Sequence, residues 1–467
     1  MSEVCNRGDA LDADFLQKRI SQMVADQKQY FLTGATLPLQ TRRAALSAIL
    51  SGLEEHEDQF LEALESDLGK PRIEAWLSEI FFLKTELRLT IKRLKRWMKP
   101  ESAGHPLFLL PSVSSIHRDP FGTALVISPW NYPLQLALAP AISAIAGGNT
   151  VVIKPSESTP ATSRVLAELI QQSCPPELAT VIEGDASTAS ALLEQDFDFF
   201  FFTGGEKVGR IVAHAAAEKL APCVLELGGK CPAVIDWSTD IPKAVERIAS
   251  GKFFNAGQTC LAPDFVAVPD ILLDEFLSEL GSFLELAYGG KQMEIAHCIN
   301  EKHRERVLSL VPDHASQVGN DGPEPLKLAP RWAVVDWGDP CMKEEIFGPF
   351  LPIISYPERS SFIDKLAQLP SPLALYLFSD SRDFCNEVMK HLPSGSVCIN
   401  DVMKQALNLE LPFGGVGPSG HGRYRGRAGF NTFTYQRPVS RRFMIKDLFA
   451  IRPPYGGMLR KMRKCLK

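Results

Sequence analysis

Residues 123–153 place two short apolar runs, Thr123-Ala-Leu-Val-Ile127 and Thr150-Val-Val-Ile153, on either side of the longer apolar stretch Leu134 to Ala146. The short runs are rich in β-branched residues and predict buried strands, whereas the longer stretch predicts a helix. A strand, a helix and a second strand in this order are typical of the βαβ unit. The two strands of such a unit lie parallel in one sheet.

The same alternation continues along the chain. Further strands are predicted at Thr180-Val-Ile182, Phe197 to Phe202, Ala233 to Asp236 and Phe265 to Pro269. Further helices are predicted over Pro160 to Gln172, Ala186 to Glu194, Lys207 to Lys219, Ile241 to Phe253 and Leu272 to Leu286. We therefore expect an α/β protein with doubly wound parallel sheets, whose ligands bind beyond the carboxyl ends of the strands.

The segment before this region has a different pattern. Apolar residues at helical spacing predict three helices, over Leu16 to Tyr30, Gln40 to Asp67 and Ile73 to Trp97. The stretch Pro100 to Pro120 is interrupted by prolines, which disfavour a helix. It predicts strands that leave the first domain.

Length and composition limit the possible functions. A chain of 467 residues predicts two or three domains, and its net charge of −5 gives no reason to expect nucleic acid as a partner. The ten cysteines include no CxxC pair or zinc-type spacing. Together with an acidic N-terminus unlike a secretory signal, this predicts reduced thiols, a cytoplasmic location and no metal. The apolar stretch Leu136 to Gly148 is too short to span a bilayer.

Three loops at the predicted strand ends carry polar or small residues. Ser128-Pro-Trp-Asn131 offers an amide donor for an oxyanion, and Lys154-Pro-Ser-Glu157 offers a cation and a carboxylate for ribose hydroxyls or a phosphate. Thr203-Gly204-Gly205 opens a helix whose N-terminus can receive a pyrophosphate. Each loop alone is a weak signal, because a glycine pair or a single asparagine more often forms an ordinary turn or cap. The G-x-G-x-x-G fingerprint of dinucleotide-binding dehydrogenases is absent.

Two carboxylates lie beside glycine or an aromatic ring. Glu226 precedes Gly228 and Gly229, where the backbone can approach a cofactor closely, and Glu345 lies two residues before Phe347. On a strand, Glu345 and Phe347 would share a face, whereas on a turn they need not.

Cys260 ends the sequence Phe253-Phe-Asn-Ala-Gly-Gln-Thr-Cys260, in which a predicted helix breaks at a glycine and presents a thiol. A nucleophilic thiol needs fixed backbone geometry and small neighbours that admit a substrate. A plain buried cysteine is the common alternative for this residue type.

Taken together, these motifs resemble the aldehyde dehydrogenase superfamily from about residue 20 to residue 437, in the family's motif order. The stretches 94–101 and 127–133 are most similar to the class 3 branch, which includes fatty and aromatic aldehyde dehydrogenases. The resemblance implies that Cys260 is the nucleophile, that Glu226 is the general base, and that Asn131 and the Cys260 N–H form the oxyanion hole. It also implies that cofactor contacts come from Lys154, Glu157, Gly204, Gly205, Glu345 and Phe347.

The resemblance implies a fold with a Rossmann-type cofactor domain (1–100 and 119–226), an α/β catalytic domain (227–415) and a bridging or oligomerisation β element (101–118 and 416–467). It implies NAD-dependent oxidation of medium- or long-chain aliphatic aldehydes through a cysteine thiohemiacetal and thioester, by a homodimer, with NADP as a possible cofactor. We also expect that local electrostatics or Glu226 aids ionisation of the Cys260 thiol, because a free thiol is only slightly ionised at neutral pH.

Other functions stay open at this point. Aromatic aldehydes are the second choice of substrate. A dehydrogenase that passes the thioester to coenzyme A is an alternative, although Glu226 favours water as the acceptor. A non-enzymatic protein that kept only the fold is the third alternative.

The chain from Arg437 onward carries ten Lys and Arg residues against one acid, Asp447, interleaved with apolar side chains. This basic C-terminal tail predicts either a solvated or subunit-bound segment or peripheral contact with an anionic membrane.

Overall fold

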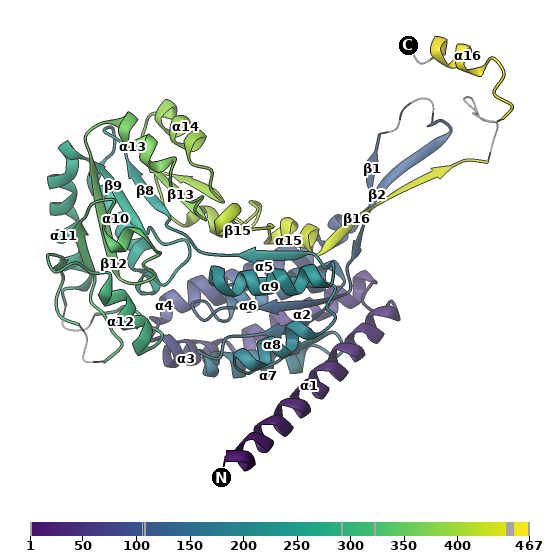
Figure 1. Ribbon diagram of the computed structural model, residues 1–467, viewed down its shortest axis with the longest axis horizontal. Helices are drawn as coiled ribbons and strands as arrows, with labels where there is room; N and C mark the ends of the chain where they lie inside the picture. Colours follow the sequence, from purple (N-terminus) through teal and green to yellow (C-terminus); the bar gives the residue numbers. More distant parts are fainter. Residues whose placement is uncertain are drawn as a thin grey trace.

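The computed structural model describes residues 2–104, 106, 109–290, 293–321, 324–444 and 453–465, with side chains from Leu16 onward except at residues 461, 464 and 465. The chain forms a body of two α/β lobes and a β arm that projects from it (Figure 1). The lobes contain a six-stranded and a seven-stranded sheet, and the arm contains a three-stranded sheet. This confirms the predicted α/β fold class with its additional β element.

The six-stranded sheet has the order β15-β7-β6-β3-β4-β5. Its strands are β3 (Thr123–Ile127), β4 (Thr150–Lys154), β5 (Ala179–Val181), β6 (Phe199–Thr203), β7 (Cys223–Glu226) and β15 (Gly420–His421). All neighbouring pairs are parallel except β15 with β7. In this register Ile127 pairs with Lys154 and with Phe202, and Thr203 pairs with Glu226. The loops that follow β3, β4, β6 and β7 therefore leave the sheet on the same side, at the carboxyl ends of these strands.

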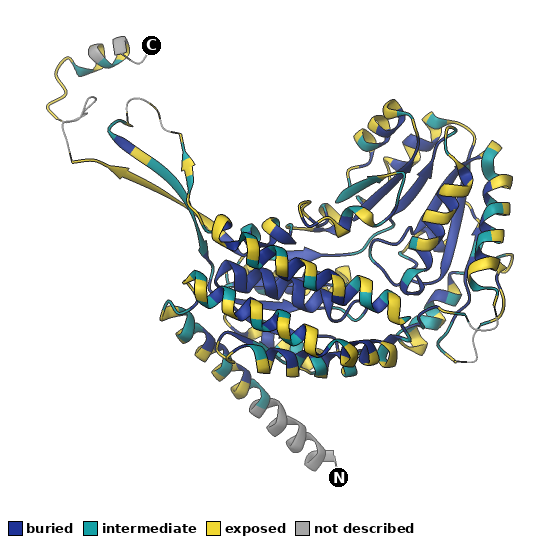
Figure 2. Cartoon of the chain, turned by 180° about the vertical axis from the view of Figure 1, so that it is seen from behind, coloured by how far each residue is buried: buried dark blue, intermediate teal, exposed yellow. Residues whose placement is uncertain are grey.

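Helices cover both faces of this sheet because its strands are buried on both sides (Figure 2). Helix α6 (Gln135–Gly147) is buried at every residue, and its composition of alanine, leucine and isoleucine explains why. The other helices that follow these strands are α7 (Pro160–Ser173), α8 (Ala186–Glu194) and α9 (Glu206–Glu218). The βαβ unit predicted over residues 123–153 is thus confirmed.

The N-terminal helices are α1 (Ser2–Leu32), α2 (Leu39–Glu55), α3 (Glu57–Leu68), α4 (Arg72–Ala75), the π-helix η1 (Trp76–Phe81) and α5 (Phe82–Trp97). The single helix predicted from Gln40 to Asp67 is therefore wrong. It breaks at His56, whose φ of −92° and ψ of 11° are not helical and whose ring Nδ1 lies 2.8 Å from the Gly52 carbonyl oxygen.

The second lobe has the sheet order β10-β11-β12-β9-β8-β13-β14, parallel except for β10. Its strands are β8 (Pro232–Ile235), β9 (Phe265–Pro269), β10 (Ser316–Gln317), β11 (Arg331–Val334), β12 (Phe350–Tyr356), β13 (Ala374–Phe378) and β14 (Ser396–Ile399). Its helices are α10 (Ile241–Phe253), α11 (Leu273–Tyr288), α12 (Glu301–Ser309), α13 (Arg359–Leu366) and α14 (Arg382–His391). The described residues also form short 3₁₀ turns: η3 (Phe254–Gly257), η4 (Asp270–Leu272), η5 (Pro340–Met342), η6 (Lys404–Leu407) and η7 (Gly417–Ser419).

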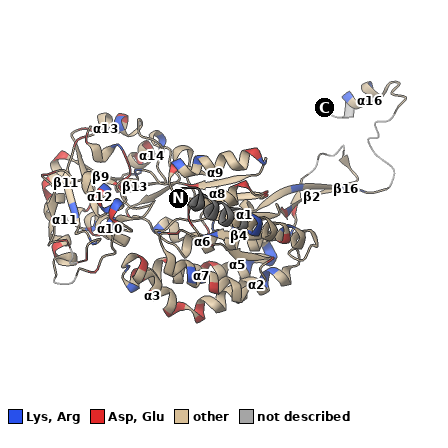
Figure 3. Ribbon diagram, turned by 60° about the horizontal axis from the view of Figure 1, so that its bottom comes forward, with Lys and Arg blue, Asp and Glu red and all other residues tan. Residues whose placement is uncertain are grey.

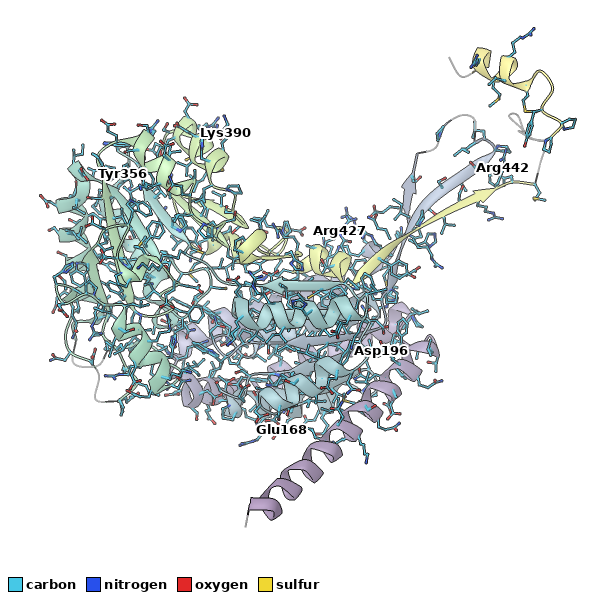
Figure 4. All side chains as sticks on the ribbon, in the orientation of Figure 1. Glu168, Asp196, Tyr356, Lys390, Arg427 and Arg442 are labelled. Carbon is cyan, nitrogen blue, oxygen red and sulfur yellow. The ribbon has the colours of Figure 1, made fainter. Side chains whose placement is uncertain are left out.

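The arm consists of β1 (Glu101–Ala103), β2 (Ser112–Pro120) and β16 (Thr434–Arg442), all antiparallel. Helix α15 (Gly426–Thr432) joins it to the body, where Arg427 donates to Glu101 Oε1 at 2.7 Å. Figure 4 shows Arg427 beside the root of the arm and Arg442 far along it. The strands predicted between Pro100 and Pro120 are present, and the domain boundaries drawn from sequence stay a prediction.

Positions of Lys and Arg and positions of Asp and Glu are interspersed along the outer helices (Figure 3). Of the basic tail, helix α16 (Met458–Cys465) is described, whereas residues 445–452, including Asp447, lie outside the described residues. No helix in the described ranges is long and apolar enough to cross a membrane. Within the same ranges, no group of three His, Cys, Asp or Glu side chains has the arrangement of a metal site.

Candidate active site

A cavity of about 590 Å³ lies beyond the carboxyl ends of β6 and β7 and is closed on its other side by loops of the second lobe. It is lined by seven of the nine residues predicted from sequence: Asn131, Gly204, Gly205, Glu226, Cys260, Glu345 and Phe347. Lys154 and Glu157 lie outside this lining. The topology therefore brings together residues that are more than 200 positions apart in the chain.

Cys260 follows a strained and buried turn. Asn255 and Ala256 both have a φ of 54°, a left-handed conformation that is uncommon outside glycine. The Asn255 N–H donates to Glu74 Oε2 at 2.8 Å, and its side-chain amide donates to the Asn131 carbonyl oxygen at 3.0 Å. These bonds hold the turn against its strain and fix the direction from which Cys260 enters the cavity.

The electrostatic surroundings of Cys260 oppose its ionisation. Burial raises the pKa of the thiol to about 12, and the negative charges of Glu345 and Glu226 act in the same direction. The Arg425 guanidinium and the Cys260 N–H lower it. The predicted electrostatic aid is thus present only in part, through Arg425, because the charge of Glu226 acts the opposite way.

Asn131 is fixed by a buried ion pair that the sequence analysis did not identify. Lys70 Nζ lies 2.5 Å from Glu79 Oε1, both side chains are fully buried, and the same Nζ donates to the Asn131 carbonyl oxygen at 3.1 Å. Asn131 Nδ2 donates to the Gln258 carbonyl oxygen at 3.1 Å, so its second amide N–H can serve a ligand. The ion pair therefore sets the position of the predicted oxyanion donor.

We expect Lys70→Met to lower the free energy of unfolding by about 3–5 kcal/mol, because Glu79 is left as an uncompensated buried charge. Urea unfolding measures this change, and kcat should fall as well because the Asn131 backbone loses a donor.

The matched control is Lys28→Met, which removes a partly exposed pair with Asp196 at 2.5 Å (Figure 4) and should cost less than about 1 kcal/mol. A Lys70→Met/Glu79→Met double variant should recover part of the lost stability. Equal destabilisation by the Lys70 and Lys28 variants would contradict the role assigned to the buried pair.

Glu226 ends β7 and is 2% exposed. Burial raises the pKa of this carboxyl well above its usual range, against the opposing charges of Arg425 and Arg423 and the Gly415 N–H. Within 3.5 Å and in hydrogen-bond geometry, the described part of the chain gives neither carboxylate oxygen a donor. A buried carboxyl whose pKa is raised in this way is a candidate for proton exchange with a bound group.

Glu345 and Phe347 lie on a turn, so they need not share a face. Burial raises the pKa of Glu345 to about 8, and a Cβ added to Gly228 would lie 2.2 Å from its Oε2 atom. Phe347 has a φ of 51°, and its carbonyl oxygen lies 2.8 Å from His303 Nε2. Its ring stands edge-on to Trp130 at a centroid distance of 5.5 Å. The strained turn thereby places an aromatic wall against the cavity.

The predicted pyrophosphate position has the features such a group needs. Helix α9 begins after Gly205, and no side chain caps its N-terminus, so its first N–H groups are available to an anion. A Cβ added to Gly205 would meet nothing within 4 Å, and the buried Thr203 Oγ1 has no hydrogen-bond partner among the described residues. An uncapped helix end, an open glycine and an unpaired hydroxyl at one wall fit a dinucleotide phosphate.

Lys154 and Glu157 form an ion pair at the end of β4, where Lys154 Nζ lies 2.9 Å from Glu157 Oε2. Burial acts to raise the pKa of Glu157, but its own N–H and the Lys154 ammonium outweigh it, so the pKa is lowered. Glu157 is therefore ionised at neutral pH. Because β4 lies beside β3 in the sheet, the pair is next to the Asn131 loop although it does not line the cavity.

A second cavity of about 590 Å³ meets the first at Cys260 and Leu136, which line both. Most of its lining surface is apolar, and the apolar side chains are Leu77, Phe81, Phe82, Leu136, Phe254, Leu261, Val402, Met403, Ala406, Leu407, Leu409 and Phe413. The charged residues in the same wall are Glu246, Arg247, Asp401, Lys404 and Arg425. The thiol therefore lies where the two cavities meet.

Several residues of the site were not identified from sequence. Arg306 donates to the backbone oxygens of Glu345 and Ile346, His303 packs beside Phe347, and Arg425 lines the apolar cavity. Their segments look like ordinary helix or loop sequence. Arg306 lies in the highly charged helix α12 and Arg425 in a run of basic residues, so nothing in their local sequence reveals their burial or contacts.

Known proteins resemble this chain over nearly its whole length. The model of the aldehyde dehydrogenase family matches residues 13–439. The 4,4'-diaponeurosporen-aldehyde dehydrogenase of Staphylococcus aureus is 38% identical over 455 residues, which cover 96% of this chain and 99% of that protein. The aldehyde dehydrogenase family 3 member H1 of Arabidopsis thaliana is 37% identical over 454 residues, covering 95% and 94%. A solved structure described as the substrate-bound state of Staphylococcus aureus AldH has a TM-score of 0.92 and 38% identity, covering 96% of this chain and 99% of that one.

Proposed function

This chain belongs to the aldehyde dehydrogenase family, and we propose that it oxidises apolar aldehydes to carboxylic acids with NAD(P), preferring medium- and long-chain aliphatic aldehydes over aromatic ones. The resemblance to class 3 aldehyde dehydrogenases is confirmed by the family 3 relative. The observation that carries the substrate class is the second cavity, whose lining surface is mostly apolar and which reaches Cys260. The name of the Staphylococcus aureus relative supports an apolar substrate.

The residues of the site support a two-stage reaction. The Cys260 thiolate attacks the aldehyde carbon, and the oxygen that becomes negative accepts hydrogen bonds from the Asn131 amide and the Cys260 N–H. Loss of one such donor costs ~3 kcal/mol or more in barrier. When bound, NAD(P) supplies the hydride acceptor for oxidation to the Cys260 thioester. Glu226 then takes a proton from the water that hydrolyses this thioester.

The cofactor is expected to occupy the first cavity, which is lined by the predicted cofactor residues at the start of α9 and in the Glu345 loop. Gly204 and Gly205 would hold its pyrophosphate at the start of α9, while Glu345 would hold the nicotinamide ribose. Phe347 would pack against the nicotinamide ring, and Lys154 with Glu157 would contact the adenosine ribose.

The test of this function is the production of NAD(P)H at 340 nm from acetaldehyde through hexadecanal, with benzaldehyde and cinnamaldehyde in parallel. A kcat/KM that rises with chain length supports the aliphatic proposal, and a preference for the aromatic aldehydes replaces it with the second one. Stoichiometric cofactor binding without turnover of any aldehyde would contradict the enzymatic function.

We propose NAD as the preferred cofactor, because the ionised Glu157 accepts hydrogen bonds from a ribose 2′-OH and repels a 2′-phosphate. Glu157→Gln is expected to raise the ratio of kcat/KM for NADP to that for NAD by about tenfold, or ~1.4 kcal/mol. Steady-state kinetics with both cofactors measure the ratio.

The matched control is Glu168→Gln, which removes an exposed carboxylate from α7 (Figure 4). A ratio that moves equally in both variants would show that net charge, not Glu157, discriminates between the cofactors.

We further propose a homodimer, a reducing cytoplasmic compartment and a membrane-facing tail. Strand β16 is an exposed edge strand, and the eight cysteines from Cys174 to Cys398 are free thiols. Light scattering should give twice the chain mass of 51.5 kDa.

Cosedimentation with phosphatidylserine vesicles should decrease when the residues after Arg442 are removed, and no decrease would reject the membrane contact.

A further inference from the structure

Arg425 is a buried cation in the wall of the apolar cavity, which it shares with Cys260. The side chain is 4% exposed. Its guanidinium carbon lies 4.0 Å from the ring centroid of Phe413 and 4.7 Å from that of Phe82. It also donates from Nη1 to the Ala406 carbonyl oxygen. Aromatic faces and a carbonyl group therefore hold this charge in place.

The backbone fixes where Arg425 points. The residue has a φ of 75°, and it directly follows Tyr424, whose N–H and carbonyl bond to those of Phe413 across an antiparallel bridge. Its guanidinium carbon is 5.5 Å from the Tyr424 ring centroid. A left-handed arginine between a paired tyrosine and the start of α15 is a costly local conformation that the surrounding contacts must impose.

The charge of Arg425 is not neutralised by a contact ion pair. No carboxylate oxygen of the described residues lies within 4.0 Å of its guanidinium, and its Nε has no hydrogen-bond partner among them. Buried carboxyls act on it from farther away: Glu86, which accepts the Gly426 N–H at 3.0 Å, and Glu226. A buried charge without a contact partner has its full effect on any negative charge that forms nearby.

In the proposed reaction, negative charge forms on the Cys260 thiol and on the Glu226 carboxyl, and Arg425 acts on both. Arg425 lowers the pKa of Cys260, of Glu226 and of Glu86, against the larger effect of burial at each. The other titratable groups that act on or with Cys260 are Glu345, Glu226, Cys231 and Tyr132. Other cations also line the two cavities: Arg247 and Lys404 line the apolar one, and Lys230, Arg306 and Lys343 line the first. Arg425 is the cation with the largest effect on the thiol.

We propose that Arg425 is a positioning residue for catalysis, whose guanidinium favours the Cys260 thiolate during attack and the Glu226 carboxylate during hydrolysis from a fixed place in the substrate-side wall. The inference rests on the roles proposed above for Cys260 and Glu226. It adds that the wall of the substrate cavity also sets the charge state of the catalytic pair.

The first test is alkylation of Cys260 by iodoacetamide, followed by peptide mass spectrometry between pH 6 and pH 10, in the full chain without aldehyde or cofactor. Arg425→Met is expected to slow alkylation about tenfold at each pH, equivalent to one pKa unit, whereas Arg425→Lys retains most of the rate. Because this readout needs no turnover, it is independent of whether the proposed dehydrogenase activity is found.

The second test is the pH profile of kcat. In Arg425→Met the acid limb should move to higher pH by about one unit, because the Glu226 carboxyl ionises less readily. Arg425→Gln replaces the methionine variant if that variant does not fold. Arg331→Gln is the matched control, since Arg331 is a buried arginine paired with Asp321 at 2.7 Å outside both cavities, and it should change neither readout.

Two results would overturn the proposal. The first is that the Arg425→Met and Arg425→Gln variants have the same rate of Cys260 alkylation and the same pH profile of kcat as the unmodified chain. The other is a lysine variant as slow as the methionine variant, which would assign the effect to the shape of the arginine side chain and not to its charge.

Discussion

Cys260→Ala is expected to lower kcat for every aldehyde by ~10⁴-fold or more, because alanine provides no atom that can form the covalent intermediate. Removal of the nucleophile from a site that acts as a unit leaves only the small rate that binding and oxyanion stabilisation provide. The measurement is NAD(P)H production at saturating cofactor, with the most active aldehyde of the series.

Two controls show that the loss is chemical. Cofactor binding to Cys260→Ala, followed by fluorescence, should be unchanged because the pyrophosphate and ribose contacts lie on other loops. Cys223→Ala, which removes a half-buried thiol from β7, should retain activity. A Cys260→Ala variant with more than about a hundredth of the normal kcat would contradict the assignment of the nucleophile.

The parts of this fold that could be predicted from sequence are those in which local pattern and tertiary role agree. The runs at 123–127 and 150–153 are buried on both faces of a parallel sheet, so their continuous apolar character is a direct record of their environment. The candidate residues at strand ends follow from the same logic, because parallel strands deliver their loops to one edge. Asn131, Gly204, Gly205 and Glu226 line the cavity for that reason. Cys260, Glu345 and Phe347 reach it from loops of the second lobe that precede β9 and β12, which the strand pattern alone does not predict.

The residues that could not be predicted depend on contacts between distant segments. Lys70 lies between two helices and looks like a solvated lysine, yet it is buried against Glu79 and the Asn131 loop. Arg425 lies in a run of basic residues, where nothing local distinguishes a buried guanidinium from an exposed one. The break at His56 was missed because apolar spacing continues on both sides of it, so the pattern alone gives one helix.

Glu226→Gln is expected to separate the two stages of the reaction. Glutamine has the shape of glutamate but accepts no proton, so thioester formation should persist while its hydrolysis slows by ~10²- to 10⁴-fold. Rapid mixing should then show a burst of NAD(P)H close to one equivalent per Cys260, followed by a slow steady rate. The same experiment with Cys260→Ala should show no burst.

The pH dependence of that slow phase tests the same assignment. In the unmodified enzyme, Glu226 has a raised pKa, so hydrolysis should become faster as pH rises through that value and the carboxylate forms. In Glu226→Gln this dependence should disappear, because no group at the position titrates. The same measurement is repeated with added coenzyme A. If coenzyme A raises the steady rate of both the unmodified chain and Glu226→Gln, the thioester is passed to a thiol acceptor. The hydrolytic role of Glu226 is then wrong. If coenzyme A has no effect and the steady rate of Glu226→Gln does not depend on pH, Glu226 is the group that activates water.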